Sequence, residues 1–405
     1  MPDPGDGVPY RPGTRRTAAP QATLERVRPW LPAMGITRIA NITGLDRVGI
    51  PTVTVIRPNS RSVAVAQGKG LDLASAKVSG VMEAIEVFHA ETVLRPALWA
   101  STAELQGDRR VVDVAALPRL SAEPLPADVP VLWAEGVRLD DGGPCWLPFE
   151  TVSTDYSVPS PPGSGWFVAT TNGLASGNTR TEAVLHGLCE VIERDAVALW
   201  RLGGAGLRAA TRLDPAAIAD PAAGELLGRF ARAGVAVGLW DATSDIGVAC
   251  VVALVAGSDG EADPEIGAGC HPSRDAAVIR ALTEAAQARV GFISGSRDDL
   301  FPRLFAPEAR RARAELARTW LRGDPARRPD DLPDFAGASP DADLAHVRAA
   351  LARAGFGAAV MVDLTRPPFE IPVVRIVVPG LEGPSGDGPS PAPGPRAAAI
   401  RDRDR

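Results

Sequence analysis

Three segments of the chain carry polar residues at one shared spacing. In an α-helix that turns about 100° per residue, positions i, i+4 and i+7 fall at about 0°, 40° and 340°. Each triplet therefore forms one narrow polar line along a predicted helix. The three lines consist of Ser79, Glu83 and Glu86; of His186, Glu190 and Glu193; and of Arg280, Glu284 and Gln287.

A row of glutamates on an amphipathic helix usually marks only its solvated face. Here one spacing occurs on three separate helices, and the neighbouring residues are small or apolar, as in SGVMEAIE, HGLCEVIE and ALTEAAQ. Converging carboxylates repel one another unless a cation lies between them, and hard oxygen ligands suit Mg²⁺. We therefore predict that four residues bind Mg²⁺ or support its ligands: Glu83, Glu86, Glu190 and Glu193.

Two loops that precede these helices supply complementary groups. Lys69 lies in the Gly-rich segment 67–70, where glycines allow close backbone approach and the ammonium can meet a phosphate. The G-x-x-x-x-G-K-[ST] spacing of a P-loop is absent from the sequence. The segment 171–179 brings backbone N–H groups and Asn172 to a helix N-terminus, which favours anions.

The polar lines need helices, and the helices need sheets to pack against. Short β-branched runs alternate with long helical patterns, which predicts an α/β fold. Strands are predicted at 52–56, 62–66, 129–133, 235–240, 248–255, 358–362 and 373–378. Helices are predicted at 72–92, 179–202, 217–233, 274–293, 307–321 and 343–354.

Composition limits the class of protein and its compartment. The 405 residues carry 43 Lys and Arg against 49 Asp and Glu, and the net charge of −6 argues against a dedicated nucleic-acid binder. Only two of the 43 are lysines, Lys69 and Lys77, so the lysine of the Gly-rich segment is informative. No apolar run approaches the ~20 residues that span a membrane. Four scattered cysteines suit a reduced, cytoplasmic protein.

At these residues the sequence resembles the YcaO family. The resemblance is most specific in NGLASGNTRTEAVLHGLCEVIERDA, and it includes GKG with SGVMEAIE, HPSRDAAVIRALTEAAQARVGFISGSRDDL and DLTRPPFEIPVVRIVVPGLEG. It implies an enzyme that uses ATP and Mg²⁺ to activate a backbone amide by phosphorylating the amide oxygen. It also implies a YcaO-like α/β fold of mixed sheets packed with helices, whose nucleotide site is not a P-loop.

The resemblance also divides the chain into three parts. Residues 35–383 are expected to form the YcaO-like catalytic domain. Residues 1–34 are an N-terminal extension that is predicted to be partly disordered. Residues 384–405 are a Pro- and Arg-rich tail that is predicted to be disordered.

The family's motifs assign roles to single residues. S-x3-E-x2-E falls on the first polar line, and Q-x3-E-x2-E falls on the second, where His186 replaces Gln. Arg194 and Arg289 are the expected catalytic cations, although either could instead form a structural salt bridge with a nearby acid. Arg375 has the same alternative. The residues expected to contact the nucleotide are Lys69, Ser79, Asn172, His186, Arg280, Glu284, Gln287 and Arg375.

Within the family, ITGLDRVGIP and ISGSRDDL are most similar to members that act with a TfuA-type protein and install backbone thioamides. This implies a precursor peptide as substrate, a TfuA-like partner and a sulfide donor, with no nucleic-acid or membrane partner. A homodimer is left open.

Two alternatives remain: an azoline-forming cyclodehydratase that acts on Cys, Ser or Thr of a precursor peptide, and a non-catalytic ATP-binding scaffold subunit. Cyclodehydratases often end in P-x-P-x-P, which residues 389–393 match. However, 12 residues follow this string, and 38 prolines make chance matches common.

Overall fold

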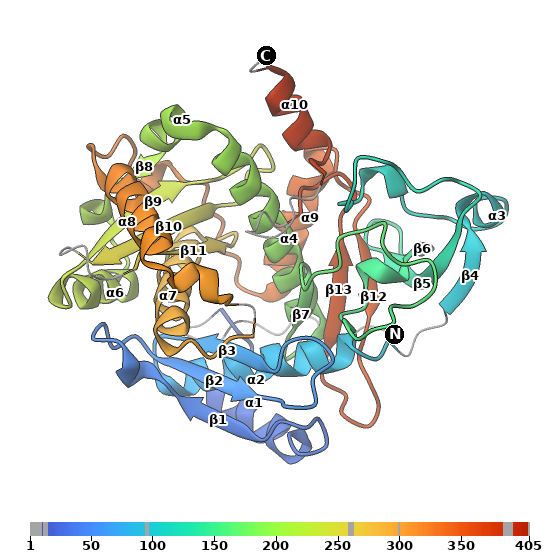
Figure 1. The fold of residues 1–405 in the computed structure, drawn as a ribbon, viewed down its shortest axis with the longest axis horizontal. Coiled ribbons are helices and arrows are strands. Elements are labelled where there is room, and N and C mark those ends of the chain that lie inside the picture. The colour runs from blue at the N-terminus through green and yellow to red at the C-terminus, as the bar shows by residue number, and fades with distance from the viewer. Residues whose placement is uncertain are drawn as a thin grey trace.

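The α/β fold predicted from the sequence is confirmed (Figure 1). The computed structural model describes residues 10, 15–93, 97–257, 263–298, 300–383 and 392–403. The strands are β1 (Arg38–Asn41), β2 (Thr52–Ile56), β3 (Val65–Lys69), β4 (Ala97–Ser101), β5 (Pro130–Arg138), β6 (Pro144–Pro148), β7 (Leu174–Ser176), β8 (Arg212–Leu213), β9 (Val235–Asp241), β10 (Cys250–Gly257), β11 (Glu265–Cys270), β12 (Val360–Asp363) and β13 (Val373–Val377). The helices are α1 (Pro20–Val27), α2 (Leu73–Ala90), α3 (Thr102–Leu105), α4 (Arg180–Leu202), α5 (Gly204–Ala210), α6 (Pro221–Arg232), α7 (Arg274–Ser294), α8 (Pro307–Leu321), α9 (Pro340–Arg353) and α10 (Pro395–Arg403).

The strands form three sheets, and the pairs between these strands are antiparallel. One sheet has the order β1-β2-β3 and a second has the order β11-β10-β9-β8. The largest has the order β4-β5-β12-β13-β7, with β6 paired to β5. α2 packs on β2 and β3, α7 packs on β10 and β11, and α4 packs on β7 and β13 (Figure 1). Each helix with a polar line therefore covers a different sheet.

Glycines in the strands let two of these helices approach closely. A Cβ on Gly68 would lie 2.1 Å from the Ala76 carbonyl oxygen of α2. A Cβ on Gly267 would lie 2.2 Å from the Ala285 nitrogen of α7. β3 therefore runs three residues later than predicted, because its glycine pairs inside the sheet beneath α2. β11 was missed because a Gly-rich segment has low β-propensity.

The helices begin and end where local signals place them. Asp72 accepts a hydrogen bond from Ser75 N at the start of α2, and Thr179 accepts one from Glu182 N at the start of α4. α7 ends at Ser294 and is capped by Gly295, whose φ of 57° is the left-handed conformation that glycine tolerates. Such caps each contribute roughly 1 kcal/mol to helix stability.

The core forms on the faces opposite the polar lines. Val81 and Ile85 of α2, and Leu188 and Ile192 of α4, are fully buried, each with an exposed fraction of 0%. Burial of each such side chain contributes roughly 1.5–3 kcal/mol. No helix in the described part of the chain is both long and apolar enough to cross a lipid bilayer.

Described residues of both termini are packed against the domain. In the N-terminal extension, α1 is helical and contacts α2. In the tail, α10 is helical, and Glu382 accepts hydrogen bonds from Gly394 N at 2.9 Å and Ala397 N at 2.8 Å. The prediction of a disordered tail is therefore wrong for residues 392–403, because low-complexity sequence did not reveal the buried acceptor that receives it. Of the two predicted terminal segments, residues 1–9, 11–14, 384–391 and 404–405 lie outside the described residues.

Candidate functional site

The three polar lines come together between α2, α4 and α7. Lys69 Nζ at the end of β3 lies 2.8 Å from Glu284 Oε2 on α7. Arg280 of α7 donates a hydrogen bond to His186 Nε2 of α4 at 3.0 Å. Glu193 of α4 accepts a hydrogen bond from the Cys270 backbone N–H at 2.9 Å. These contacts join three sheets through one polar cluster.

Glutamates of the cluster are short of neutralising charge. Burial raises the pKa of Glu86 to about 8, and the nearby charges of Glu190 and Glu83 add to the rise, although Ser176 opposes it with a 2.6 Å hydrogen bond. Burial likewise raises the pKa of Glu190 to about 7, against the charge of Arg194. Burial also raises the pKa of Glu83 and Glu193.

Glu284 behaves in the opposite way. Burial pushes the pKa of Glu284 upward, but the charges of Lys69 and Arg194 outweigh burial and bring the pKa down to about 2. Lys69 therefore neutralises the negative charge of Glu284 on the third polar line. The carboxylates of the first two lines have too few nearby cations to offset their burial. A divalent cation at those carboxylates would restore the balance.

Arg194 is bound to acids of its own helix. Its guanidinium lies 3.9 Å from Glu190 Oε1 and 3.6 Å from Glu193 Oε1. Arg194 thus lies in the cluster as predicted by motif, but as the ion-pair partner of two glutamates. The salt-bridge alternative describes its geometry, and a contact with phosphate stays a prediction.

Arg289 lies away from the cluster. It is nine positions after Arg280, which places it about 180° around α7 from the polar line. Its Nε and Nη2 donate to the two carboxylate oxygens of Asp46 at 2.8 and 3.2 Å, and the side chains are 7% and 2% exposed. This geometry matches the structural salt bridge that was the alternative for Arg289, and a catalytic role for Arg289 stays a prediction.

Arg375 and Asn172 line a separate cavity of about 50 Å³, which Lys69 and Arg280 do not line. Arg375 donates to the backbone oxygens of Thr151 at 2.9 Å and Thr170 at 2.5 Å. The structure therefore does not place these two residues with the phosphate candidates of β3 and α7.

Several buried polar atoms of the predicted site have no hydrogen-bond partner among the described residues. They are Gln67 Nε2, Asn172 Oδ1, His186 Nδ1, Gln287 Oε1 and Arg375 Nη1. Burial and the charge of Arg280 lower the pKa of His186, so its ring is neutral and able to share one proton. Ser79 is half-buried on α2. The unused atoms of His186 and Gln287 lie on two of the polar lines, and a nucleotide offers both donors and acceptors that could satisfy them.

The glutamates alone do not form a metal cage. In the described part of the chain, no three His, Cys, Asp or Glu side chains are arranged to hold a metal ion by themselves. Mg²⁺ commonly uses one or two protein carboxylates, with waters and phosphate oxygens as its other ligands. The glutamates of α2 and α4 fit that pattern, and the direct assignment of all four as ligands stays a prediction.

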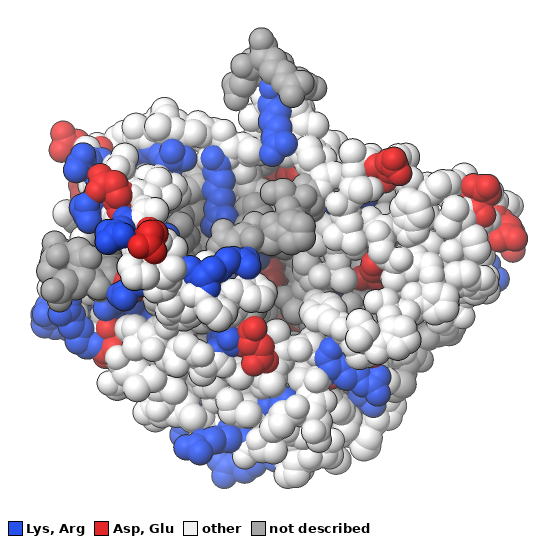
Figure 2. All heavy atoms as spheres, viewed as in Figure 1, with Lys and Arg blue, Asp and Glu red and all other residues white. Residues whose placement is uncertain are grey.

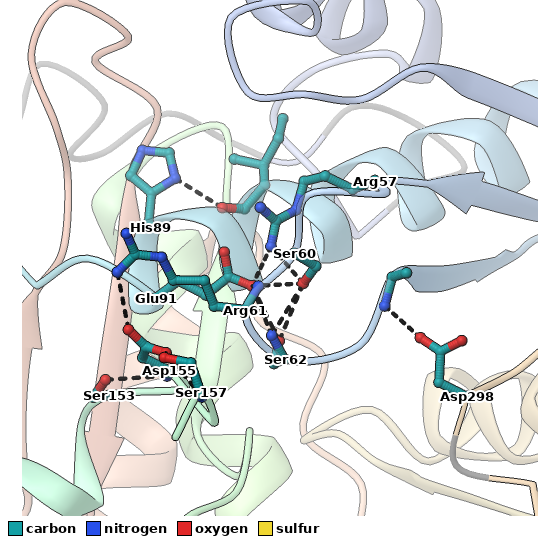
Figure 3. Close-up of polar contacts among 12 residues, drawn as sticks. Arg57, Ser60, Arg61, Ser62, His89, Glu91, Ser153, Asp155, Ser157 and Asp298 are labelled. Atoms are coloured by element: carbon teal, nitrogen blue, oxygen red, sulfur yellow. Dashed lines mark hydrogen bonds and ion pairs between the residues drawn. The ribbon is translucent and has the colours of Figure 1, made fainter. Parts of the chain in front are cut away.

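A buried glutamate holds the β2–β3 hairpin against the end of α2 (Figure 3). Glu91 accepts hydrogen bonds from Ser60 Oγ at 2.5 Å and Arg61 N at 2.7 Å. It also forms an ion pair with Arg57. Because β3 leaves this hairpin and ends at Lys69, these contacts fix Lys69 relative to the glutamates of α2.

The N-terminal segment contacts the start of α4, and the sequence did not predict this contact. Thr17 donates to Glu182 Oε1 through its backbone N–H at 2.6 Å and its hydroxyl at 2.7 Å. Arg16 lies 3.8 Å from the same carboxylate, and its charge lowers the pKa of His186. In the sequence, Glu182 three positions after Thr179 indicates only a capping box, whereas the arginines near the start of the chain were the signal of a cationic contribution.

The distribution of charge on the face shown in Figure 2 does not indicate a nucleic-acid binding surface. Lys and Arg side chains there are mixed with Asp and Glu and gather mainly on the side of α6 and α8. The surface around β5 and β6 is largely uncharged. A continuous basic stripe, which nucleic-acid binding favours, is not seen on this face.

Relatives of the chain share most of its length. A family model described as YcaO cyclodehydratase, ATP- and Mg²⁺-binding, matches residues 67–382. An uncharacterized protein in the tfuA 3′ region of Rhizobium leguminosarum bv. trifolii is 35% identical over 377 residues, which cover 91% of this chain and 88% of that protein. An uncharacterized protein of Methanothermobacter thermautotrophicus is 37% identical over 370 residues, or 90% of this chain and 94% of that protein.

Solved structures share the fold. YcaO from Methanopyrus kandleri, bound with AMPPCP and Mg²⁺, has a TM-score of 0.74 at 25% identity, with 96% of this chain and 100% of that chain covered. A heterocyclase in complex with substrate and cofactor has a TM-score of 0.76 at 22% identity, with 93% of this chain but 54% of the heterocyclase covered. The chain therefore belongs to the YcaO family, whose cofactors are ATP and Mg²⁺.

Proposed function

We propose that this chain activates a backbone amide in a ribosomally made peptide: sulfide adds to the amide carbon, the amide oxygen is phosphorylated, and phosphate leaves with that oxygen. The observation that carries the proposal is the cluster in which the glutamates of α2 and α4 face the Lys69–Glu284 pair. The raised pKa values mean that the protein alone lacks the cations to keep these carboxylates ionised. Mg²⁺ with a bound triphosphate supplies that positive charge and neutralises the transferring phosphates.

A sulfide equivalent adds to the amide carbon, and the electrons of the C=O π bond move onto oxygen. The oxygen takes the γ-phosphoryl group of ATP, which releases ADP. The carbon–oxygen bond then breaks as the added sulfur forms the C=S bond and gives up its proton, and inorganic phosphate leaves with that oxygen and takes up the proton. The products are a thioamide, ADP and phosphate.

The chain's own residues would bind and orient the phosphates. Lys69 has three N–H donors and uses one for Glu284, so others remain for phosphate oxygens. Arg280 is held by His186, which fixes the direction of its guanidinium. Arg194 bridges two glutamates and thereby keeps their carboxylates close to one another. Such fixed charges act without reorganising at the moment of transfer.

A TfuA-like partner and thioamide formation are supported by the relative encoded in a tfuA 3′ region. The family description as a cyclodehydratase favours a second candidate, in which a Cys, Ser or Thr side chain of the peptide attacks the preceding carbonyl. Both reactions use the same phosphorylation, so the site supports either nucleophile. The product distinguishes them.

The test combines the purified chain with the TfuA-like protein and a precursor peptide from the same genome. ATP, Mg²⁺ and sulfide are added, and the peptide is analysed by mass spectrometry. We expect exchange of one oxygen for sulfur, with one ADP formed per thioamide and no product when sulfide is omitted. Loss of one water would instead assign azoline formation. ATP binding without peptide-dependent hydrolysis would assign the scaffold role.

A further inference from the structure

Arg375 is a buried cation with an unused donor. It is 2% exposed, and among the described residues no carboxylate forms an ion pair with it. Two of its nitrogens are engaged by the backbone oxygens of Thr151 and Thr170, but Nη1 has no hydrogen-bond partner among those residues. Burial lowers its pKa to about 10, so the side chain still carries its charge at neutral pH. An unpaired buried cation is costly and is typical of functional sites.

Asn172 contributes an unused acceptor to the same place. Asn172 and Arg375 both line the cavity of about 50 Å³, together with Thr151, Thr170 and Val191. Asn172 Oδ1 is buried and has no hydrogen-bond partner in the described chain. A cavity of this size holds one or two waters or one small chemical group. It therefore combines one unused donor and one unused acceptor.

The cavity adjoins the glutamate cluster. Val191 lines the cavity. Burial raises the pKa of the preceding residue, Glu190, and the charges of Arg375 and Arg280 both oppose that rise. α4 contacts β13, which carries Arg375, and also β11, which lies beneath α7 (Figure 1). The glutamates of α4 can thus be approached from the β13 side as well as from the phosphate candidates of α7.

A surface loop also approaches this side. Arg61 binds Asp155 at 3.0 Å and accepts a hydrogen bond from Tyr156 N at 2.9 Å, which fixes the loop on the β2–β3 hairpin (Figure 3). Tyr156 is 43% exposed, and it lies close enough to Arg375 for an ionised phenolate to raise the pKa of Arg375. A partly exposed aromatic residue near the cavity offers a surface along which an extended peptide can lie.

We propose that this cavity is the subsite for the reacting peptide amide, in which Arg375 Nη1 donates to the amide oxygen and Asn172 Oδ1 accepts from the amide N–H. The proposal rests on the proposed function, because a backbone amide is the group to be phosphorylated. It reassigns both residues from the nucleotide to the peptide.

The two unused atoms favour an amide over a phosphate. A secondary amide has one acceptor and one donor, and it matches the pair. A phosphate at neutral pH presents acceptors and would leave Asn172 Oδ1 facing another oxygen. Arg375 would also stabilise the negative charge that develops on the amide oxygen when the nucleophile adds.

Two small probes test the subsite in the presence of Mg²⁺ and a non-hydrolysable ATP analogue. N-methylacetamide has the amide N–H, and methyl acetate has the same shape with oxygen in its place. Ligand-observed NMR titration measures the affinity of each. We expect the wild-type chain to bind the amide roughly tenfold more tightly than the ester, because one buried hydrogen bond to a neutral group is lost. Asn172→Ala should remove this preference, and Arg375→Gln should weaken both probes.

The controls separate the subsite from the nucleotide. Both variants should keep the affinity for the ATP analogue within about twofold. Arg212 is a matched control because its guanidinium also binds backbone oxygens, those of Trp320, Leu321 and Arg322, but in the sheet of β8. The proposal is overturned if Arg375→Gln weakens the ATP analogue roughly tenfold while Arg212→Gln does not. It is also overturned if the wild-type chain does not prefer the amide.

A variant that does not fold and a peptide that is not thioamidated can each be told apart from a failure of the subsite. If Arg375→Gln does not fold by circular dichroism, the comparison of amide and ester on Asn172→Ala still decides. If the amide preference is found but no peptide is thioamidated, the subsite stands and thioamide formation is wrong.

Discussion

Lys69 Nζ lies 2.8 Å from Glu284 Oε2, although the two residues are 215 positions apart in sequence. The pair connects the end of β3 to the middle of α7, and the side chains are 24% and 25% exposed. Lys69 is therefore held in place before any phosphate arrives, and solvent can still reach it. An ammonium positioned in this way does not have to be ordered when the nucleotide binds.

Lys69→Ala should weaken binding of a non-hydrolysable ATP analogue by roughly tenfold or more, because a charge-assisted hydrogen bond to phosphate is lost. Calorimetric titration with Mg²⁺ present measures the change. Lys77→Ala is the matched control, since Lys77 is the other lysine of the chain and lies outside the cluster. Equal affinities for the two variants would show that Lys69 serves only Glu284.

Glu190→Gln should lower peptide-dependent ATP hydrolysis by roughly 100-fold, because a neutral amide binds Mg²⁺ and its waters poorly. Without Mg²⁺ the same variant should melt at a higher temperature than the wild type near pH 8, since it no longer buries a charge. Thermal melts and a phosphate-release assay measure both effects. Glu225→Gln on α6, an exposed position, controls for the loss of an acidic residue. Full turnover in Glu190→Gln would remove Glu190 from the site.

Stability should fall as the pH rises from about 4.5 to about 8 when Mg²⁺ is absent. The folded-state pKa values of Glu86 and Glu190, about 8 and about 7, lie above the ordinary value of 4.5. The folded chain then binds more protons than the unfolded chain within this window, so this stabilisation is complete below pH 4.5 and is lost as the pH rises through the folded pKa values.

Mg²⁺ competes with these protons for the same carboxylates. The increase in melting temperature that Mg²⁺ causes should therefore grow between about pH 6 and about pH 9. The double variant Glu86→Gln, Glu190→Gln should show a flatter profile. A Mg²⁺ effect that is independent of pH would mean that the ion binds elsewhere.

Arg289→Ala should destabilise the fold by about 3–5 kcal/mol, because Asp46 would remain buried without its partner. Urea unfolding measures this change. Replacing both members, by Arg289→Met with Asp46→Leu, should recover most of the loss, as expected for a structural pair. Arg311→Ala removes an exposed ion pair with Glu308 and should cost less than about 1 kcal/mol. If Arg289→Ala keeps wild-type stability but loses nucleotide binding, Arg289 binds the phosphates and is not a structural residue.

The sequence by itself determined the three helices that carry the polar lines and the composition of those lines. A helical period is a local property, so the spacing of Glu83 and Glu86 was enough to place them on one face of a helix. The rarity of lysine marked Lys69 before any contact was known. The order of strands and helices was likewise sufficient for the α/β class.

Tertiary structure alone decided which distant partners Arg289 and Arg375 take. Arg289 meets Asp46 across 243 positions, and Arg375 meets backbone oxygens across more than 200 positions, where no local pattern indicates a partner. The tail shows the same limit. The Ala397 backbone N–H of α10 donates to Glu382, and the low-complexity sequence of the tail does not indicate this buried acceptor. Local periodicity determines which face a side chain occupies, whereas ion pairs and cavities depend on how separate elements pack together.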